Sequence, residues 1–423
     1  MSDKMAFKRR EFVRLSVAAA AASLSPRTFS QSRGASPIKL GMVTPVTGRF
    51  ASYGASAIPG AMLAAKLING GGGIASLGGA PIELVIVDTK GDAKVTVAET
   101  ERLINEEKVV GIVGPFSSLD ALAANPLSDQ YRIPFVSPFW SSEKAFTLNS
   151  RYSRTLNLVS SSYASGGVNM LKVLRAKYGL ARKVALVYDS GEYGKGASAA
   201  ARPLLEAAGM VPVLDLPVTP GASDYGPTIL RIRDSGADTI LAGFYFQESV
   251  LLLRAADSLN FRAPIVGMGS GFTDVRLPGA LGPEVAARAL KAPVFGTATG
   301  MRLDTKYAPL QKLLKASESE SVRPGNTPGI ELQWYGLAAQ AVNVFRLGLE
   351  QAASRDGVNL NNAIAALKLA RGSDTMVSPF YDPAIAWDQA GKPLNQVPSI
   401  EQWQDGKAVI VYPDDVATGG PRI

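Results

Sequence analysis

Short, continuously apolar runs alternate with longer stretches of mixed polarity through the first third of the chain. Such runs are typical of strands that are buried on both faces, and we predict strands at 38–43, 82–87, 109–113 and 133–136. Between the first two, apolar residues recur at helical spacing, and we expect Ile58, Met62, Ala65 and Ile68 to form a buried helix face. Asp92 stands where it can cap the next helix.

The alternation of apolar runs and stretches of mixed polarity breaks off at Arg154-Thr155 and then begins again as a second series. We predict strands at 183–188, 211–216, 239–243 and 265–267, with helices at 199–208, 225–234 and 250–259. The glycine-rich stretch from Asp189 to Gly196 is predicted to be a turn. Strands alternating with helices in this way predict an α/β fold built on mostly parallel sheets.

The last third of the chain reads mainly as helix. We predict helices at 307–316, 331–351 and 360–369, and a hairpin at 400–412 that turns at Asp405-Gly406. Trp334 and Tyr335 lie on the second of these helices, and we expect them to belong to the core rather than to a ligand-binding wall. The last ten residues are expected to be frayed.

Two loops at the centre of the first series share one pattern. Gly114-Pro115-Phe116-Ser117-Ser118 and Ser137-Pro138-Phe139-Trp140-Ser141 each follow a predicted strand and combine aromatic residues with serines. Parallel strands end at one edge of a sheet, so N–H groups and hydroxyls of both loops would point at one place, which suits a carboxylate or an amide. Alternatively, Ser117 and Ser118 only cap the helix that begins near Leu119. The residues alone leave both interpretations open.

Composition excludes several chemistries. The chain has 423 residues, 46% of them hydrophobic, and contains neither Cys nor His. A disulfide, a thiolate zinc site, a cysteine nucleophile and a Ser-His-Asp triad are therefore impossible, and neither a G-x-S-x-G nor a P-loop spacing occurs. We expect no catalysis, no metal and no cofactor. Half of the net charge of +8 falls in residues 1–30, so the remainder is too dispersed to predict nucleic-acid binding.

The N-terminus has the order of parts found in an export signal. Arg9-Arg10 and Phe12 precede a weakly apolar run from Leu15 to Leu24 and a polar stretch, a pattern that resembles a twin-arginine signal. We predict that residues 1–30 are this signal, with cleavage after Ser30. The alternative is a frayed basic helix on a cytosolic protein. Because no lipobox cysteine follows, the mature protein is expected to be free in the periplasm.

Several short matches in sequence order resemble one family. They are Val46-Thr47-Gly48 with Tyr53-Gly54, Gly114 to Ser118, Ser137-Pro138, Asp189 with Tyr193-Gly194, Asp224-Tyr225, and Trp387-Asp388 with Trp403. From Ile38 to Tyr412 the chain resembles the type I periplasmic solute-binding proteins that serve ABC importers, in particular the branched-chain amino acid and amide group, with leucine-binding protein as the model.

The resemblance implies two α/β lobes joined by three crossovers near Thr155, near Pro293 and between Val377 and Trp387. The first lobe would comprise 37–155 and 294–377, the second 156–293 and 388–413, with 414–423 as a tail. A small-molecule solute would bind in the cleft and close it by hinge motion, and the partner of the monomeric protein would be an inner-membrane ABC permease.

The resemblance also implies ligand-binding residues. Ser117 and Ser118 would hold a carboxylate with backbone N–H groups, and Ser141 would add a hydroxyl and an amide. Tyr53 would line the mouth, Tyr193 would close from the other lobe, and Tyr245, or alternatively Phe244, would pack over the ligand. Besides these residues, we expect four more to line the site, namely Phe116, Phe139, Trp140 and Gly269.

Two departures bear on the solute. Gly269 stands where amino-acid binders of the family carry an acidic residue for the ligand ammonium, so either Glu248 or Asp274 replaces that residue or the ligand lacks an amine. Glu248 reads more simply as part of the first turn of its helix. Phe139 and Trp140 stand where small residues are common. Together these favour an aromatic or other amine-free carboxylate, or an amide, over leucine, isoleucine or valine.

The expected function is therefore that of an exported receptor that captures a small carboxylate- or amide-bearing solute and delivers it to a permease. One alternative is a sensory receptor of the same fold that reports ligand occupancy to a signalling partner. Another is a secreted enzyme that uses carboxylates. The residues do not identify the solute.

Overall fold

The structure is a computed structural model that describes residues 35–148 and 150–423. The predicted export signal at 1–30 lies outside the described residues. Among the helices of the described ranges, none combines the length and the apolar character needed to cross a membrane.

The first lobe is built on a five-stranded parallel sheet with strand order β2-β1-β3-β4-β5. Its central strands are buried on both faces, as their continuous apolar runs predict. In chain order its elements are β1 (Ile38–Thr44), α1 (Ala51–Gly70), η1 (Ala75–Leu77), β2 (Ile82–Asp88), α2 (Ala93–Asn105), β3 (Gly111–Val113), α3 (Ser118–Tyr131), β4 (Phe135–Ser137), η2 (Glu143–Leu148) and β5 (Ser153–Thr155).

The second lobe is built on a seven-stranded sheet with strand order β14-β13-β10-β9-β8-β6-β7. Five strands are parallel, and the hairpin β13–β14 is added antiparallel beside β10. Its elements are α4 (Ser160–Tyr178), β6 (Val184–Asp189), α5 (Glu192–Ala207), β7 (Leu214–Val218), α6 (Gly226–Asp234), β8 (Thr239–Gly243), α7 (Phe246–Ser258), β9 (Ile265–Gly267), η3 (Ser270–Phe272), α8 (Leu277–Leu281), α9 (Pro283–Ala289), β10 (Val294–Ala298), β13 (Ser399–Gln404) and β14 (Lys407–Tyr412).

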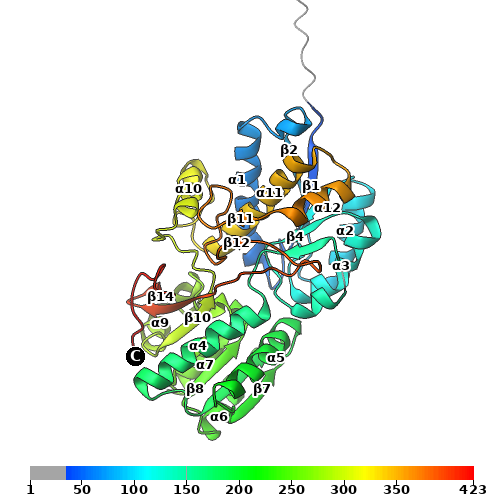
Figure 1. Cartoon of the computed structure of the whole chain (residues 1–423). Coiled ribbons are helices and arrows are strands. Elements are labelled where there is room, and N and C mark those ends of the chain that lie inside the picture. Colours follow the sequence, from blue (N-terminus) through cyan, green and yellow to red (C-terminus); the bar gives the residue numbers. More distant parts are fainter. Residues whose placement is uncertain (1–34, 149) are drawn as a thin grey trace, which may run out of the picture. The chain divides into compact units, whose positions relative to one another are not determined.

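The segment between β10 and β13 returns to the first lobe. Its helix α11 packs along α1, far away in sequence, and Figure 1 shows the two side by side. Its elements are α10 (Ala308–Ala316), η4 (Ser317–Ser319), α11 (Leu332–Ala352), α12 (Gly357–Ala366), β11 (Leu369–Ala370) and β12 (Ala384–Ile385). The prediction of two α/β lobes is confirmed. The expected boundary at Pro293 was wrong, because β10 pairs with β9 and β13 and so belongs to the second sheet.

The buried face of α1 differs from the predicted one. Ala65 is buried, but Met62 is 54% exposed, and Ile58 and Ile68 are only half-buried. The face turned to α11 carries small residues instead, since a Cβ on Gly60 would come within 2.1 Å of the Tyr335 carbonyl oxygen. Close approach of two helices thus overrode the spacing of the large apolar residues.

Several element boundaries also differ. Helix α5 begins at Glu192, within the predicted glycine-rich turn, because Gly194 allows the helix to pack on the Asp189 backbone. Strand β7 is shifted to Leu214–Val218 and includes Pro217, which an edge strand tolerates. Helix α12 begins and ends three residues early, after the Asp356 cap, and α4 was not predicted.

The C-terminal residues are not frayed as expected. The Thr418 and Gly419 N–H groups donate to the Ile410 carbonyl, and the Arg422 N–H donates to Gln402 Oε1 at 2.8 Å. Arg422 also pairs with Asp405 at 2.7 Å. The tail therefore folds back on the β13–β14 hairpin, whose turn at Asp405-Gly406 is as predicted.

Candidate functional site

A cavity of about 40 Å³ lies between the two lobes, where strands of both sheets end. All ten residues that the sequence pointed to line it, together with five others, so the structure brings the predicted set to one place. Whether they bind a ligand stays a prediction. The lining residues are Tyr53, Phe116, Ser117, Ser118, Phe139, Trp140, Ser141, Asn157, Tyr163, Tyr193, Phe244, Tyr245, Gly269, Gly271 and Trp334.

The cavity is much smaller than the roughly 300–1,000 Å³ of ordinary ligand pockets. It is lined from both sides, by Phe116 and Ser141 of the first lobe and by Tyr193 and Tyr245 of the second. A cavity of this size holds only a few water molecules.

Ser117 is the N-cap of α3. Its Oγ accepts from the Asp120 N–H at 3.0 Å, and its own N–H donates to Asp120 Oδ2 at 2.9 Å, which completes a capping box. Burial raises the pKa of Asp120, although the hydrogen bonds from Ser117 act in the opposite direction. The Ser117 N–H, which we expected to bind a carboxylate, is thus used within the cap, and the capping interpretation holds for this residue.

Ser118 joins the two serine loops. Its Oγ accepts from the Ser142 N–H at 3.2 Å and from the Ser141 N–H at 3.4 Å. For the Ser118 N–H itself, no acceptor lies among residues 35–148 and 150–423. This N–H, in the first turn of α3, is the backbone donor that remains for a ligand at the predicted serine pair.

The second loop is held by the strand and helix that follow it. Thr155 Oγ1 donates to the Trp140 carbonyl at 2.8 Å, the Asn157 amide donates to the Phe139 carbonyl, and the Ser160 N–H donates to the Ser141 carbonyl at 2.9 Å. These contacts fix the backbone, while the Ser141 hydroxyl lines the cavity without a partner in the described part of the chain.

Four aromatic side chains of the first lobe line the cavity and contact one another in a closed series. Tyr53, Phe116, Phe139 and Trp334 follow one another with ring centroids 5.1 Å, 5.1 Å, 5.9 Å and 5.3 Å apart, counted round to Tyr53. We call them the aromatic cage. Trp334 is buried, as expected, and it also lines the cavity. Two of the four contacts are T-shaped and two are tilted, and ring surfaces of this kind suit a flat apolar guest.

Trp140 packs against Phe146, with ring centroids 5.0 Å apart. Within the described residues, neither its indole N–H nor that of Trp334 has a hydrogen-bond acceptor, although both are buried. Buried donors without partners are costly.

On the side of the second lobe, Tyr193 and Tyr245 pack together with centroids 4.7 Å apart. The Tyr193 hydroxyl donates to the Met268 carbonyl, and a Cβ on Gly269 would lie 2.1 Å from that hydroxyl. Burial raises the pKa of both tyrosines, so they stay neutral. The acidic side chain expected of an amino-acid binder at position 269 has no room here.

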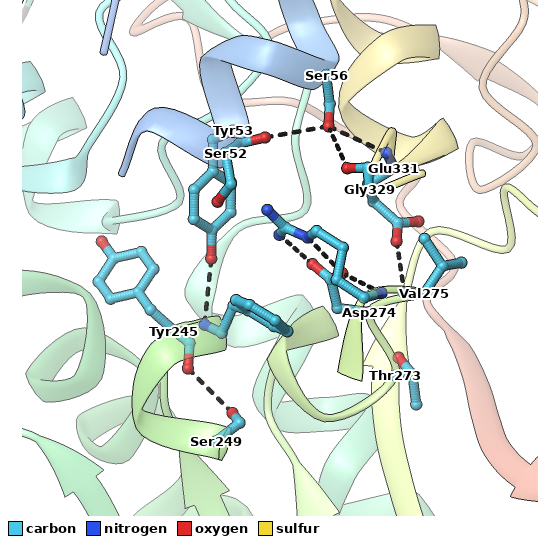
Figure 2. Close-up of polar contacts among 12 residues, drawn as sticks. Ser52, Tyr53, Ser56, Tyr245, Ser249, Thr273, Asp274, Val275, Gly329 and Glu331 are labelled. Carbon is cyan, nitrogen blue, oxygen red and sulfur yellow. Dashed lines mark hydrogen bonds and ion pairs between the residues drawn. The ribbon is translucent and has the colours of Figure 1, made fainter. Parts of the chain in front are cut away.

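Direct contacts cross between the lobes at the mouth. Figure 2 shows Tyr53 and Tyr245 close together there, and the Tyr53 hydroxyl accepts from the Phe246 N–H at 3.2 Å. The Arg276 guanidinium lies over the rings of Tyr53 and Phe246, 5.4 Å and 4.3 Å from their centroids. Tyr53 is thus buried between lobes in this closed arrangement.

Both carboxylates that we considered as partners for a ligand ammonium are already paired. Asp274 Oδ1 accepts a hydrogen bond from Arg276 Nε at 2.7 Å, and Glu248 forms an ion pair with Arg49. Neither lines the cavity. None of the described residues that line it is acidic or basic, so the site presents N–H groups, hydroxyls and rings.

Asn157, Tyr163 and Gly271 also line the cavity and were not predicted. Tyr163 donates to Asn157 Oδ1 at 2.9 Å. Tyr163 lies in the first turn of α4, which the sequence analysis missed. The run Ser160-Ser161-Ser162 ahead of apolar residues is the kind of helix-start signal that could have revealed it. No cluster of three or more metal-ligating side chains occurs in the described ranges.

Two α/β lobes with an uncharged, ring-lined cavity at their strand ends define a two-lobed solute-binding protein. The chain belongs to the periplasmic binding protein family, whose model matches residues 37–380.

Three of the proteins that are similar to this chain match it over most of its length. A Leu/Ile/Val-binding protein homolog 7 of Brucella abortus is 28% identical over 422 residues, which cover 98% of this chain and 99% of the relative. Among solved structures, the substrate-binding protein LivJ of Streptococcus pneumoniae in complex with isoleucine has a TM-score of 0.73 and 21% identity, and the match covers 89% of this chain and 100% of that one. A solute-binding protein of an ABC transporter from Rhodopseudomonas palustris HaA2, in complex with p-hydroxybenzoic acid, has a TM-score of 0.72 and 21% identity, and the match covers 88% and 95%.

Proposed function

We propose that this protein is the exported substrate-binding protein of an ABC importer, and that its solute is a small carboxylate, or an amide, without an amino group. An aromatic acid fits best. The observation that carries the proposal is the composition of the cavity wall, where an aromatic cage faces hydrogen-bond donors and no charged side chain.

The donors favour an acceptor-rich solute. The Ser118 N–H and the Ser141 hydroxyl are the groups that would bind a carboxylate or an amide oxygen, at the ends of strands where open parallel sheets bind ligands. A charge-assisted hydrogen bond to a carboxylate is stronger than one to a neutral oxygen. The cage would enclose the apolar body of the same molecule.

The acids around the cavity argue against an ammonium group. An ammonium enclosed in the closed cleft would need a carboxylate partner, and Glu248 and Asp274 are each engaged by an arginine. Asp120 is engaged in the α3 cap. The structural neighbour in complex with p-hydroxybenzoic acid supports a carboxylate without an amino group as the solute. The isoleucine complex of LivJ supports an amino acid instead.

No bond chemistry is proposed. The chain has no Cys and no His, and its work would be differential binding, because a solute that contacts both lobes favours their closed arrangement. Export through the twin-arginine route, a periplasmic location, a monomeric state and an inner-membrane permease partner complete the proposal. They rest on the N-terminal pattern and on membership of the family.

A screen of six solutes tests this function. Thermal unfolding of the purified protein is followed with L-leucine, L-isoleucine, L-valine, benzoate, 4-hydroxybenzoate and butyramide, since a ligand that binds the folded state raises the melting temperature. We expect a rise with benzoate or 4-hydroxybenzoate, and recovery of the solute chemically unchanged. A rise only with the amino acids would overturn the solute class, and conversion of a solute to product would overturn the assignment as a binding protein.

A further inference from the structure

Arg49 connects the two lobes beside the cavity. It lies in the loop between β1 and α1 of the first lobe, and its guanidinium pairs with Glu248 of α7 and, at 3.7 Å, with Asp189 at the end of β6. Both carboxylates belong to the second lobe. One cation of the first lobe thus faces two anions of the second.

The burial of these groups is unequal. The side chain of Arg49 is 31% exposed, whereas those of Glu248 and Asp189 are 1% and 3% exposed. Asp189 is held in place because its Oδ1 accepts the Gly191 N–H at 2.8 Å. Two neighbouring carboxylates buried without a cation would be strongly unfavourable. The cation therefore offsets the burial of these two carboxylates in the closed arrangement.

Arg49 also lies over two rings beside the aromatic cage, and it does not line the cavity. Its guanidinium lies 4.7 Å from the ring centroid of Phe50 and 5.9 Å from that of Tyr245. Phe50 in turn packs against Phe116 at 5.2 Å and Tyr245 at 5.0 Å. Arg49 itself is not among the lining residues. Its effect on a bound solute is therefore indirect.

We propose that Arg49 is a latch that holds the two lobes closed over the solute by pairing with Glu248 and Asp189 across the gap. The inference rests on the proposed solute-binding function for its effect on a ligand, although closure itself can be measured without one. Removal of the cation penalises the closed state and leaves the open state almost unchanged. Bound solute then escapes faster, while each lobe remains folded.

The first experiment measures closure directly and needs no solute. Since the chain has no Cys, spin labels can be placed at two introduced cysteines, Lys94→Cys in α2 and Ser223→Cys before α6, both at exposed positions in different lobes. Electron-spin distance measurements on ligand-free protein should show a short-distance population that Arg49→Ala removes. A distribution with only the longer distance before substitution, or one that Arg49→Ala leaves unchanged, would overturn the proposal.

The matched control is Arg202→Ala. Arg202 pairs with Asp215 at 2.7 Å and lies 5.5 Å from the ring centroid of Tyr188, so it makes the same kinds of contact, but entirely within the second lobe. We expect this variant to keep the interlobe distances of the unsubstituted protein. A loss of the short distance equal to that in Arg49→Ala would show a general effect of removing an arginine and would contradict the latch.

The second experiment measures solute dissociation by stopped-flow tryptophan fluorescence with each solute of the screen that binds. Arg49→Ala should raise the dissociation rate at least about tenfold and leave the melting temperature in the absence of solute unchanged. Arg49→Lys keeps a cation, so its dissociation rate should lie between those of Arg49→Ala and the unsubstituted protein. If Arg49 acts through its partner, Arg49→Ala combined with Glu248→Gln should dissociate no faster than Arg49→Ala alone. An unchanged dissociation rate would refute the latch. If no solute binds, the proposed function fails, and the distance measurements still decide on the latch.

Discussion

The hydroxyl of Tyr193 occupies the space that any side chain at position 269 would need. A Cβ there would lie 2.1 Å from the tyrosine oxygen, and Gly269 has a φ of +139°, which L-residues rarely adopt. The two residues line the same cavity from the second lobe. The glycine is therefore the residue that allows Tyr193 to reach the Met268 carbonyl and to close one wall of the site.

Gly269→Ala should weaken binding of the tightest solute of the screen by at least about tenfold, or 1.4 kcal/mol, because Tyr193 must leave its position. Isothermal titration calorimetry measures the change. Gly279→Ala is the matched control, since a Cβ at Gly279 meets nothing within 4 Å. Equal affinities of the two variants would contradict the assignment of Tyr193 to the binding wall. Tyr193→Ala should weaken binding to a similar extent.

The two serines of the first loop should respond differently to substitution. Ser117→Ala removes the cap of α3 and should lower the free energy of unfolding by about 1 kcal/mol. Ser118→Ala removes the hydroxyl that accepts from the Ser141 and Ser142 N–H groups, and should weaken solute binding at least about tenfold. Melting temperature and calorimetric affinity, measured on both variants, separate the two roles. A Ser118→Ala variant with full affinity would contradict the role of the Ser118 hydroxyl in holding the second loop for the solute.

Trp334→Phe opens one side of the aromatic cage. It should weaken binding of benzoate or 4-hydroxybenzoate about tenfold, because ring contacts with the guest are lost. Trp403→Phe is a suitable control, since Trp403 is equally buried at 6% exposure but donates to the Phe272 carbonyl away from the cavity. Both changes should lower the melting temperature, but only the first should alter the affinity. Parallel losses of affinity would indicate a global effect.

Stability should fall as the pH rises from about 4.5 to 7. Burial raises the pKa of Glu331 from 4.5 to about 7, and the negative charge of Asp274 acts in the same direction. The charges of Arg302 and Arg276 lower this pKa but do not outweigh burial. The folded protein then holds a proton that the unfolded chain has lost, so the stabilisation is complete below pH 4.5 and disappears by about pH 7. Burial raises the pKa of Asp189 to about 6 with the same sign.

Glu331→Gln should flatten this profile, because glutamine keeps an oxygen for the Val275 N–H, which Glu331 Oε2 accepts at 2.8 Å, and carries no charge. Figure 2 shows this contact, and also Ser56 Oγ, which accepts from the Glu331 N–H at 3.0 Å. Melting temperatures at pH 5 and pH 8 test the prediction, with Glu106→Gln at an exposed position as the control. The chain has no histidine, so no imidazole contributes to the profile in this range. A profile equal to that of the unsubstituted protein would contradict the role of Glu331.

Local patterns were sufficient for much of the fold. The apolar runs at β1, β3 and β4 and the hairpin at Asp405-Gly406 were found because strand burial and tight turns depend on residues close in sequence. Local patterns failed at Gly60 and Gly194, where glycine reflects close approach to a distant or neighbouring backbone rather than a chain break. They failed also at the tail, whose contacts with Gln402 and Ile410 are tertiary.

For the site, the sequence was enough to indicate that serines and rings gather at strand ends, because parallel strands end at a common edge. It could not show that Trp334 completes the cage or that Arg49 pairs with Glu248. Each of these depends on which groups of distant segments come within about 3 to 6 Å of one another. That distance is set by the packing of whole helices and lobes, and no spacing along the chain encodes it.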